Sequence, residues 1–260
     1  MLSIQLLGPP QLLLNDRALS ISRRKSRALL FYLAAQPGPV LRDQLLALLW
    51  PDQDRASAQQ VLRTSLYGLR KELGPAIEAA DDTLALAPAT VVDARRFERA
   101  IATPNGAPEP LAAALALYRG DFLAGFSLPD CEEFESWAEG LRERYRQLAQ
   151  RGYAALAQRH EAQHDYAAAL DALERALALS PLQEDLQRAA MRAEYYAGNR
   201  AAAIRRYEQL RRLLDDELGV PPMDETRALY DAIITDALPM ENERRNTKDE
   251  EIAQAQRPHP

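Results

Sequence analysis

The chain has 260 residues, of which 47% are hydrophobic and 27% charged, as is ordinary for a soluble globular protein of one large domain or two smaller ones. Its single cysteine, Cys131, excludes an intrachain disulfide and fits a reducing cytosol, and no apolar run approaches the roughly 18 to 20 residues of a membrane span. The net charge of −6 is uneven, because residues 1–97 carry 12 of the 32 Lys+Arg but only 9 of the 38 Asp+Glu, so a mildly basic third precedes an acidic remainder.

The first twenty residues predict two or three short strands. The segments LSIQLL, QLLL and ALSIS alternate in hydrophobicity, and the turn sequences GPP and NDR separate them. A helix is then expected over SRRKSRALLFYLAA, with Ser22 as its N-cap and Pro37-Gly38 after its end. The next stretch, LRDQLLALLW, is expected to form a short amphipathic helix that Pro51 stops.

A third helix is expected from about Ala56 to Leu73, where Gly74 takes the C-terminal stop position. The segment IEAADDTLALAP that follows has two alternating halves around Asp81-Asp82, which predicts a hairpin. Strands, three helices and a hairpin in this order predict a winged helix-turn-helix over residues 1–92, in which a recognition helix precedes a β-wing.

The third helix divides into two faces when it is projected at about 100° per residue. The expected core face consists of Ala58, Val61, Leu62, Ser65, Leu66, Leu69 and Leu73. The opposite face carries Gln60, Arg63, Thr64, Tyr67 and Lys71, with Arg70 at its edge and Glu72 toward the other side. Arg63 suits guanine, Gln60 suits adenine, and the Thr64 methyl suits thymine. We therefore predict DNA base contacts from Gln60, Arg63, Thr64 and Tyr67, although a solvated amphipathic face is the plain alternative.

Phosphate contacts are predicted for six basic residues, namely Arg23, Arg24, Lys25, Arg27, Arg70 and Lys71. The first four open the first helix, where basic side chains and free backbone N–H groups suit phosphate, although such a cluster can also serve solubility alone. The expected wing tip opposes DNA, because Asp81 and Asp82, with Glu78 nearby, would repel phosphate. Either this wing stays off the groove or the affinity for DNA is weak.

An internal repeat occupies the helical remainder of the chain. A shift of 34 residues places HDYAAALDALERAL (164–177) on GNRAAAIRRYEQLR (198–211), so that three alanines match and Leu173 falls on Tyr207. A 34-residue period with small residues near the start of the second helix is typical of tetratricopeptide (TPR) arrays. Residues 93–238 are therefore predicted to form an all-α TPR-like domain. Residues 239–260, which are charged and poor in large apolar side chains, are predicted to be a disordered tail or a linker.

Residues 160–164, HEAQH, match the zinc-peptidase pattern H-E-x-x-H. The repeat register argues against zinc, because it places His164 on Gly198, at the turn between paired helices, and His160 on Glu194. A peptidase of this kind needs the second His firmly within its helix. We therefore predict that the chain is no enzyme, with neither a catalytic residue nor a metal site nor a cofactor. Cys131 lies between carboxylates, which do not activate a thiol.

Several phrases resemble a known family. The run RRKSRALLFYLAAQPGPVLRDQLLALLWPD, followed by VLRTSLYGLRKELG, resembles the DNA-binding domain of SARP-type activators, the antibiotic regulatory proteins, whose winged helix is of the OmpR kind. The phrases VDARRFERAI, ALALYRGDFLAGF and FESWAEGLRERY are similar to the bacterial transcriptional activator domain that follows in this family. The resemblance covers about residues 1–238. The wing departs from the family pattern, since DDTLALAP replaces a Gly-Tyr-rich strand.

The resemblance implies a mainly α fold with a small β component and a sequence-specific transcriptional regulator, expected to be an activator. It would read the major groove of double-stranded promoter DNA with helix 56–73, often at repeated sites, and would use the TPR-like domain to dimerise and to contact RNA polymerase. It would lie in the cytoplasm with the nucleoid and have no membrane partner. The acidic wing keeps open an alternative, a TPR-type protein adaptor whose DNA-binding domain is degenerate.

Overall fold

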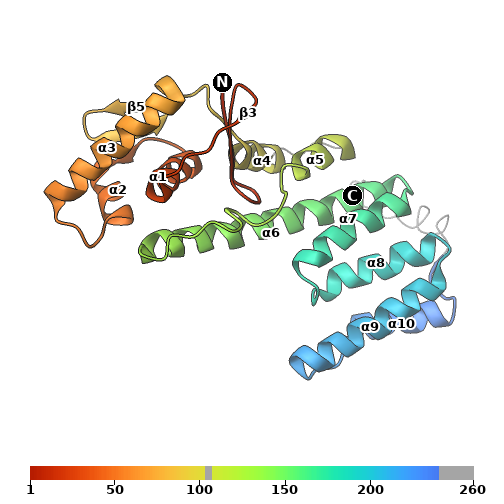
Figure 1. Cartoon of the computed structure of the whole chain (residues 1–260). Coiled ribbons are helices and arrows are strands. Elements are labelled where there is room, and N and C mark those ends of the chain that lie inside the picture. Colours follow the sequence, from red (N-terminus) through yellow and green to blue (C-terminus); the bar gives the residue numbers. More distant parts are fainter. Residues whose placement is uncertain (103–106, 240–260) are drawn as a thin grey trace, which may run out of the picture. The chain divides into compact units, whose positions relative to one another are not determined.

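The computed structural model describes residues 1–102 and 107–239. The chain divides into two compact units, of which the first is Met1–Arg159 and the second begins at His160 (Figure 1). Within the described residues, no helix is both long enough and apolar enough to cross a membrane. The predicted tail, apart from Pro239, lies outside the described residues.

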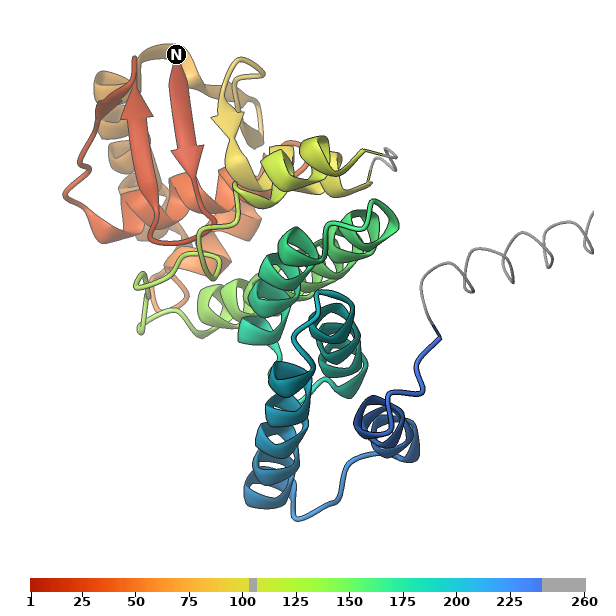
Figure 2. The same cartoon turned by 90° about the vertical axis from the view of Figure 1, so that its right-hand side faces the viewer.

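The N-terminal sheet has the strand order β3-β2-β1-β7. Its strands are β1 (Leu2–Gln5), β2 (Gln11–Leu14), β3 (Arg17–Ala18) and β7 (Val91–Val92). β1 and β2 pair antiparallel and lie side by side in Figure 2. The predicted third strand, ALSIS, is shorter in the structure, where β3 ends at Ala18. The N–H of Leu19 still donates to the Leu12 carbonyl oxygen of β2 at 2.9 Å, and the chain then leads to α1. β7, which pairs parallel to β1, is a strand that the sequence patterns did not indicate.

The winged helix-turn-helix follows in the predicted order. Its helices are α1 (Arg24–Ala35), α2 (Arg42–Leu49) and α3 (Arg55–Leu73), and a short 3₁₀ turn, η1 (Gly74–Ala76), leads to the wing. The wing hairpin consists of β5 (Ile77–Ala80) and β6 (Thr83–Leu86) (Figure 1). Its turn is at Asp81-Asp82, as predicted. A two-residue strand, β4 (Val40–Leu41), extends this sheet by pairing with β6.

Two local predictions in this region are wrong. Ser22 is not the N-cap of α1, because Arg23 holds that position without a side-chain hydrogen bond. Val61 is 36% exposed rather than buried. It lies about 100° around α3 from Leu62, at the edge of the apolar face. Such an edge position meets a neighbour only if another element reaches over it.

The first unit continues through α4 (Asp93–Ala102), α5 (Pro108–Leu115) and most of α6 (Glu132–Ala162). An aromatic cluster joins α1 to α6 and to the segment before it, and it consists of Phe31, Tyr32, Phe122, Phe126, Phe134 and Trp137. The rings of Tyr32 and Trp137 are 4.7 Å apart, in a tilted arrangement that aromatic pairs favour. Residues 93–159 therefore belong to the same compact unit as the winged helix. The domain boundaries expected from the sequence, 1–92 and 93–238, stay predictions.

The second unit contains the repeat that the 34-residue register predicts. Its helices are α7 (Tyr166–Leu179), α8 (Glu184–Tyr196), α9 (Arg200–Leu218) and α10 (Asp224–Ile234). Asp165 and Asn199, which the register aligns, are the N-caps of α7 and α9, and each side chain accepts a hydrogen bond from the backbone three residues on. Two further aligned residues, Ala169 and Ala203, are fully buried. Small side chains at this position let the paired helices approach closely.

The HEAQH segment ends a helix, as the register predicts. α6 stops at Ala162, and His164 has a positive φ of 61°, as its counterpart Gly198 has at 80°. The same closing bond follows in both repeats, from the N–H of Asp165 to the His160 carbonyl oxygen and from the N–H of Asn199 to the Glu194 carbonyl oxygen. The described residues contain no group of three or more His, Cys, Asp or Glu side chains that could hold a metal ion.

Candidate nucleic-acid interface

α3 is a well-delimited helix with one buried face. The Asp54 carboxylate accepts a hydrogen bond from the N–H of Ser57 at 3.1 Å, and hydrogen bonds from Ser57 hold the pKa of Asp54 below its ordinary value. Gly74, with a φ of 64°, ends the helix as expected. The residues buried against the rest of the first unit are Ala58, Leu62, Ser65, Leu66, Leu69 and Leu73. The helix therefore presents its other face to solvent.

The predicted base-reading residues lie together on that exposed face. Gln60, Arg63 and Thr64 are exposed, and Tyr67 is 74% exposed, which is unusual for a large aromatic side chain. The Thr64 hydroxyl donates to the Gln60 carbonyl oxygen at 2.9 Å, within its own helix. This engages the hydroxyl and leaves the methyl group of the exposed Thr64 available for apolar contact. The face thus offers one guanidinium, one amide, one phenol and one methyl group.

A cleft of about 410 Å³ separates this face from the wing tip. Its lining consists of Leu41, Arg42, Asp43, Leu46, Arg55, Gln59, Leu62, Arg63, Asp81 and Asp82. The wing tip is tied to α2, because the N–H of Arg42 donates to the Asp82 carbonyl oxygen at 2.8 Å. The acidic tip therefore borders the same cleft as Arg63, and any DNA phosphate entering it would meet both signs of charge.

Two cations of this cleft were missed by the sequence reasoning. Arg55 opens α3 and bridges to both carboxylate oxygens of Asp43, at 3.0 and 2.7 Å, while Arg42 opens α2. The signal for Arg55 was Asp54, a strong N-capping residue one position before it, which places the helix start one residue earlier than Ala56.

A second cleft, of about 240 Å³, lies between the start of α1 and the other side of α3. Arg23 lines it together with Thr64 and Tyr67, so the structure brings this predicted phosphate contact beside the exposed face of α3. Glu72 lines it too, although the helical projection placed that carboxylate away from the polar face. Arg70 and Lys71 are exposed in the last turn of α3, where positive charge also favours the helix dipole.

The other three basic residues of α1 point elsewhere. The guanidinium groups of Arg24 and Arg27 lie over the ring of Phe126, with 5.8 and 5.2 Å to its centroid. Lys25 lies beside Cys131, where burial raises the pKa of the thiol and the neighbouring ammonium partly offsets that rise. The Cys131 thiol donates to the Leu49 carbonyl oxygen at 3.4 Å. Of the four basic residues at the start of α1, the structure therefore brings only Arg23 to α3.

Two sets of contacts join the winged helix to the helices that follow it in the first unit. The Asp93 carboxylate, at the start of α4, accepts hydrogen bonds from the N–H groups of Leu6 at 2.7 Å and Leu7 at 3.1 Å. Burial raises the pKa of Asp93, and these backbone bonds act against the rise. From α4, Arg95 donates to the carbonyl oxygens of Leu33 and Gln36. Carbonyl oxygens at the C-terminal end of a helix such as α1 lack a partner within the helix.

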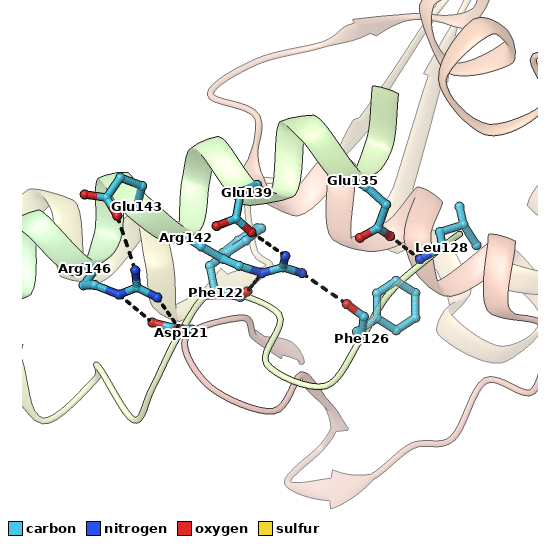
Figure 3. Close-up of polar contacts among 9 residues, drawn as sticks. All are labelled: Asp121, Phe122, Phe126, Leu128, Glu135, Glu139, Arg142, Glu143 and Arg146. Atoms are coloured by element: carbon cyan, nitrogen blue, oxygen red, sulfur yellow. Dashed lines mark hydrogen bonds and ion pairs between the residues drawn. The ribbon is translucent and has the colours of Figure 1, made fainter. Parts of the chain in front are cut away.

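A segment of residues 121–128 provides the second connection, as Figure 3 shows. On one side its backbone bonds to residues 6–8, including the N–H of Gly8 to the Asp121 carbonyl oxygen at 3.0 Å. On the other side α6 holds it, since Arg142 donates to the carbonyl oxygens of Phe122 at 3.1 Å and Phe126 at 3.3 Å. Arg146 forms an ion pair with Asp121 at 2.6 Å.

The comparisons with known proteins match almost the whole chain. The model of the family described as "Bacterial transcriptional activator domain" matches residues 89–234. The regulatory protein AfsR of Streptomyces coelicolor is 29% identical over 244 residues. That alignment covers 88% of this chain but 24% of AfsR, so the chain spans about a quarter of the length of this curated relative.

A solved structure has the same fold. It is that of Mycobacterium tuberculosis EmbR in complex with a low affinity phosphopeptide, with a TM-score of 0.70 and 24% sequence identity. The match covers 98% of this chain and 70% of that chain. The order of a strand-bearing N-terminal part and a helical repeat part is therefore an architecture that a solved protein also has.

Proposed function

Because this chain belongs to the bacterial transcriptional activator domain family and is a transcriptional regulator of the SARP type, we propose that it binds specific sites in double-stranded promoter DNA through α3. The single observation that carries the proposal is the exposed face of α3, on which Gln60, Arg63, Thr64 and Tyr67 stand together. These side chains match the hydrogen-bonding and methyl groups of base edges in the major groove.

Phosphate contacts in this proposal come from the cations that border the face. Arg23 lies in the cleft beside Tyr67, and Arg70 and Lys71 are exposed on the last turn of α3. Phosphate contacts fix the register of a protein on DNA, while base contacts carry the sequence preference. The first unit would thus supply both kinds of contact from α1 and α3.

The helical repeats would serve a different purpose. Stacked helix pairs such as α7–α8 and α8–α9 form extended surfaces that commonly bind other proteins. We assign to them dimerisation and contact with RNA polymerase, in keeping with the activator family. Binding at repeated promoter sites would follow from such a dimer, and the protein would work in the cytoplasm at the nucleoid.

The test is a footprint on the DNA upstream of the operon that encodes the chain, with base-pair substitutions across the protected site. Arg63→Ala should weaken binding by about 1–3 kcal/mol and lose discrimination at one base pair, because a bidentate arginine–guanine contact is worth that much. Arg70→Ala is the matched control, since loss of a phosphate contact should weaken all sequences alike. An Arg63→Ala variant that weakens every sequence equally would refute the base-reading role.

The acidic wing supports a second candidate function, a protein adaptor without DNA affinity. Asp81 and Asp82 border the cleft that contains Arg63, where their carboxylates oppose a phosphate. This candidate predicts a stoichiometric protein partner and no salt-dependent binding to any duplex. A purified chain that binds its own upstream region with a clear salt dependence would exclude it.

A further inference from the structure

Phe126 occupies a position between the DNA-binding helices and α6. Its ring packs edge-to-face on Phe31 of α1 at 5.1 Å and is 5% exposed. Arg24 and Arg27 both lie within cation–π distance of this ring, and Arg24 also donates to the Ser127 hydroxyl at 3.2 Å. These contacts give the two guanidinium groups a preferred place against segment 121–128.

The face of α1 that meets Phe126 is not the face that borders α3. Arg24, Arg27 and Phe31 are spaced three and four residues apart and so share one side of the helix. Arg23 and Ser26 line the cleft beside α3. The two sides are separated by about 100° around the helix. Side chains engaged with Phe126 are therefore directed away from the base-reading face.

The position of Phe126 is itself fixed from α6. Arg142 binds the carbonyl oxygens of Phe122 and Phe126, and the Glu135 carboxylate accepts from the N–H of Leu128 (Figure 3). A backbone held at both ends of a short segment leaves the ring little freedom to move away from α1.

We propose that Phe126 is a positioning residue that withdraws Arg24 and Arg27 from the DNA backbone. With Lys25 held beside Cys131, this leaves Arg23, the N-cap residue of α1, to contact phosphate. This inference rests on the proposed DNA-binding function. The contact with Phe126, which lies outside the winged helix, reduces the number of basic side chains that can contact phosphate. Segment 121–128 thereby influences the affinity of the chain for DNA of any sequence.

The first part of the test compares two neighbouring arginines in the full chain. The probe is a mixed-sequence DNA duplex, and the readout is the slope of log affinity against log salt concentration. Arg23→Ala should reduce the magnitude of that slope by about 0.9, the value of one phosphate contact, whereas Arg24→Ala should leave it unchanged. Both side chains are exposed, so neither change should disturb folding.

The second part removes the aromatic face but keeps a buried apolar side chain. Phe126→Leu should release Arg24 and Arg27 and raise the magnitude of the slope by up to about 1.8, and Arg24→Ala in that background should remove about 0.9 of the rise. Phe122→Leu is the matched control, because Phe122 is buried in the same segment, while its ring packs on Trp137 and Tyr145 and the two guanidinium groups lie over Phe126. It should leave the slope unchanged.

Three results would overturn the inference: an Arg24→Ala slope reduced as much as that of Arg23→Ala, a Phe126→Leu slope equal to wild type, or an equal rise for Phe122→Leu. A wild-type chain without any salt-dependent binding would overturn the proposed function and this inference with it. The first three results leave the proposed function standing, so the two failures are distinguishable.

Discussion

Replacing Asp93 by alanine tests how the winged helix is joined to the helices that follow it. The carboxylate is the acceptor for the buried N–H groups of Leu6 and Leu7, and neither residue has measurable exposure. A buried donor that loses its partner costs about 1–3 kcal/mol, so two such donors cost roughly 2–6 kcal/mol. Removing a buried charge offsets part of this, and we expect Asp93→Ala to lower the free energy of unfolding by about 2–4 kcal/mol.

The assay for Asp93→Ala is urea unfolding followed by tryptophan fluorescence. Both tryptophans of the chain, Trp50 and Trp137, belong to the first unit, so the signal reports that unit alone. Asp93→Asn is the control, because its amide oxygen can still accept the bonds that one of the two carboxylate oxygens accepts and should recover part of the loss. A loss below about 1 kcal/mol for Asp93→Ala would show that the joint does not depend on these bonds.

Two further predictions concern helix packing and the repeat. Gly152→Ala in α6 should be less favourable than Gly140→Ala by about 1–3 kcal/mol in the same assay, because its Cβ would lie 2.8 Å from Leu115 Cδ2 and 3.0 Å from Ile101 Cδ1. Gly140→Ala, in the same helix with open space around it, should instead be neutral or stabilising by about 0.5–1 kcal/mol, and equal effects would refute the packing argument. Asn199→Ala should cost about 0.5–2 kcal/mol through loss of the α9 N-cap, and Asp165→Ala a similar amount at α7. Circular dichroism during urea unfolding measures the free energy of unfolding of both capping variants. An Asn199→Ala variant as stable as the wild type would contradict the capping role.

Local patterns predicted much of the fold because they depend on neighbours in sequence. The repeat register predicts that Asp165 and Asn199 are equivalent, and both are N-caps. The same register placed His164 at a turn, where the structure finds a positive φ like that of Gly198. Capping and helix ends are set by a few adjacent residues, so a sequence comparison within the chain suffices to find them.

Features that depend on distant residues were not predictable. β7 pairs with β1 across nearly ninety residues of sequence, and its two valines carry no alternating pattern. Val61 was assigned to the core because its angle on the helix was near the apolar face, but burial there depends on whether another element covers it.

The candidate interface shows the same division. Helical periodicity placed Gln60, Arg63, Thr64 and Tyr67 on one exposed face, as the structure also has them. The contact of Arg24 and Arg27 with Phe126 joins residues about a hundred positions apart, and no local pattern reports such a pairing. The sequence therefore predicts one basic cluster at the start of α1, whereas its members face different neighbours.

Genome-wide mapping of the DNA bound by the chain tests the central claim most directly. The account predicts a small set of discrete promoter sites that share a sequence motif, and Arg63→Ala should blur that motif at one base pair while Arg70→Ala reduces all sites together. Occupancy without any shared motif, or no occupancy by the folded protein, would contradict the claim that α3 reads DNA sequence.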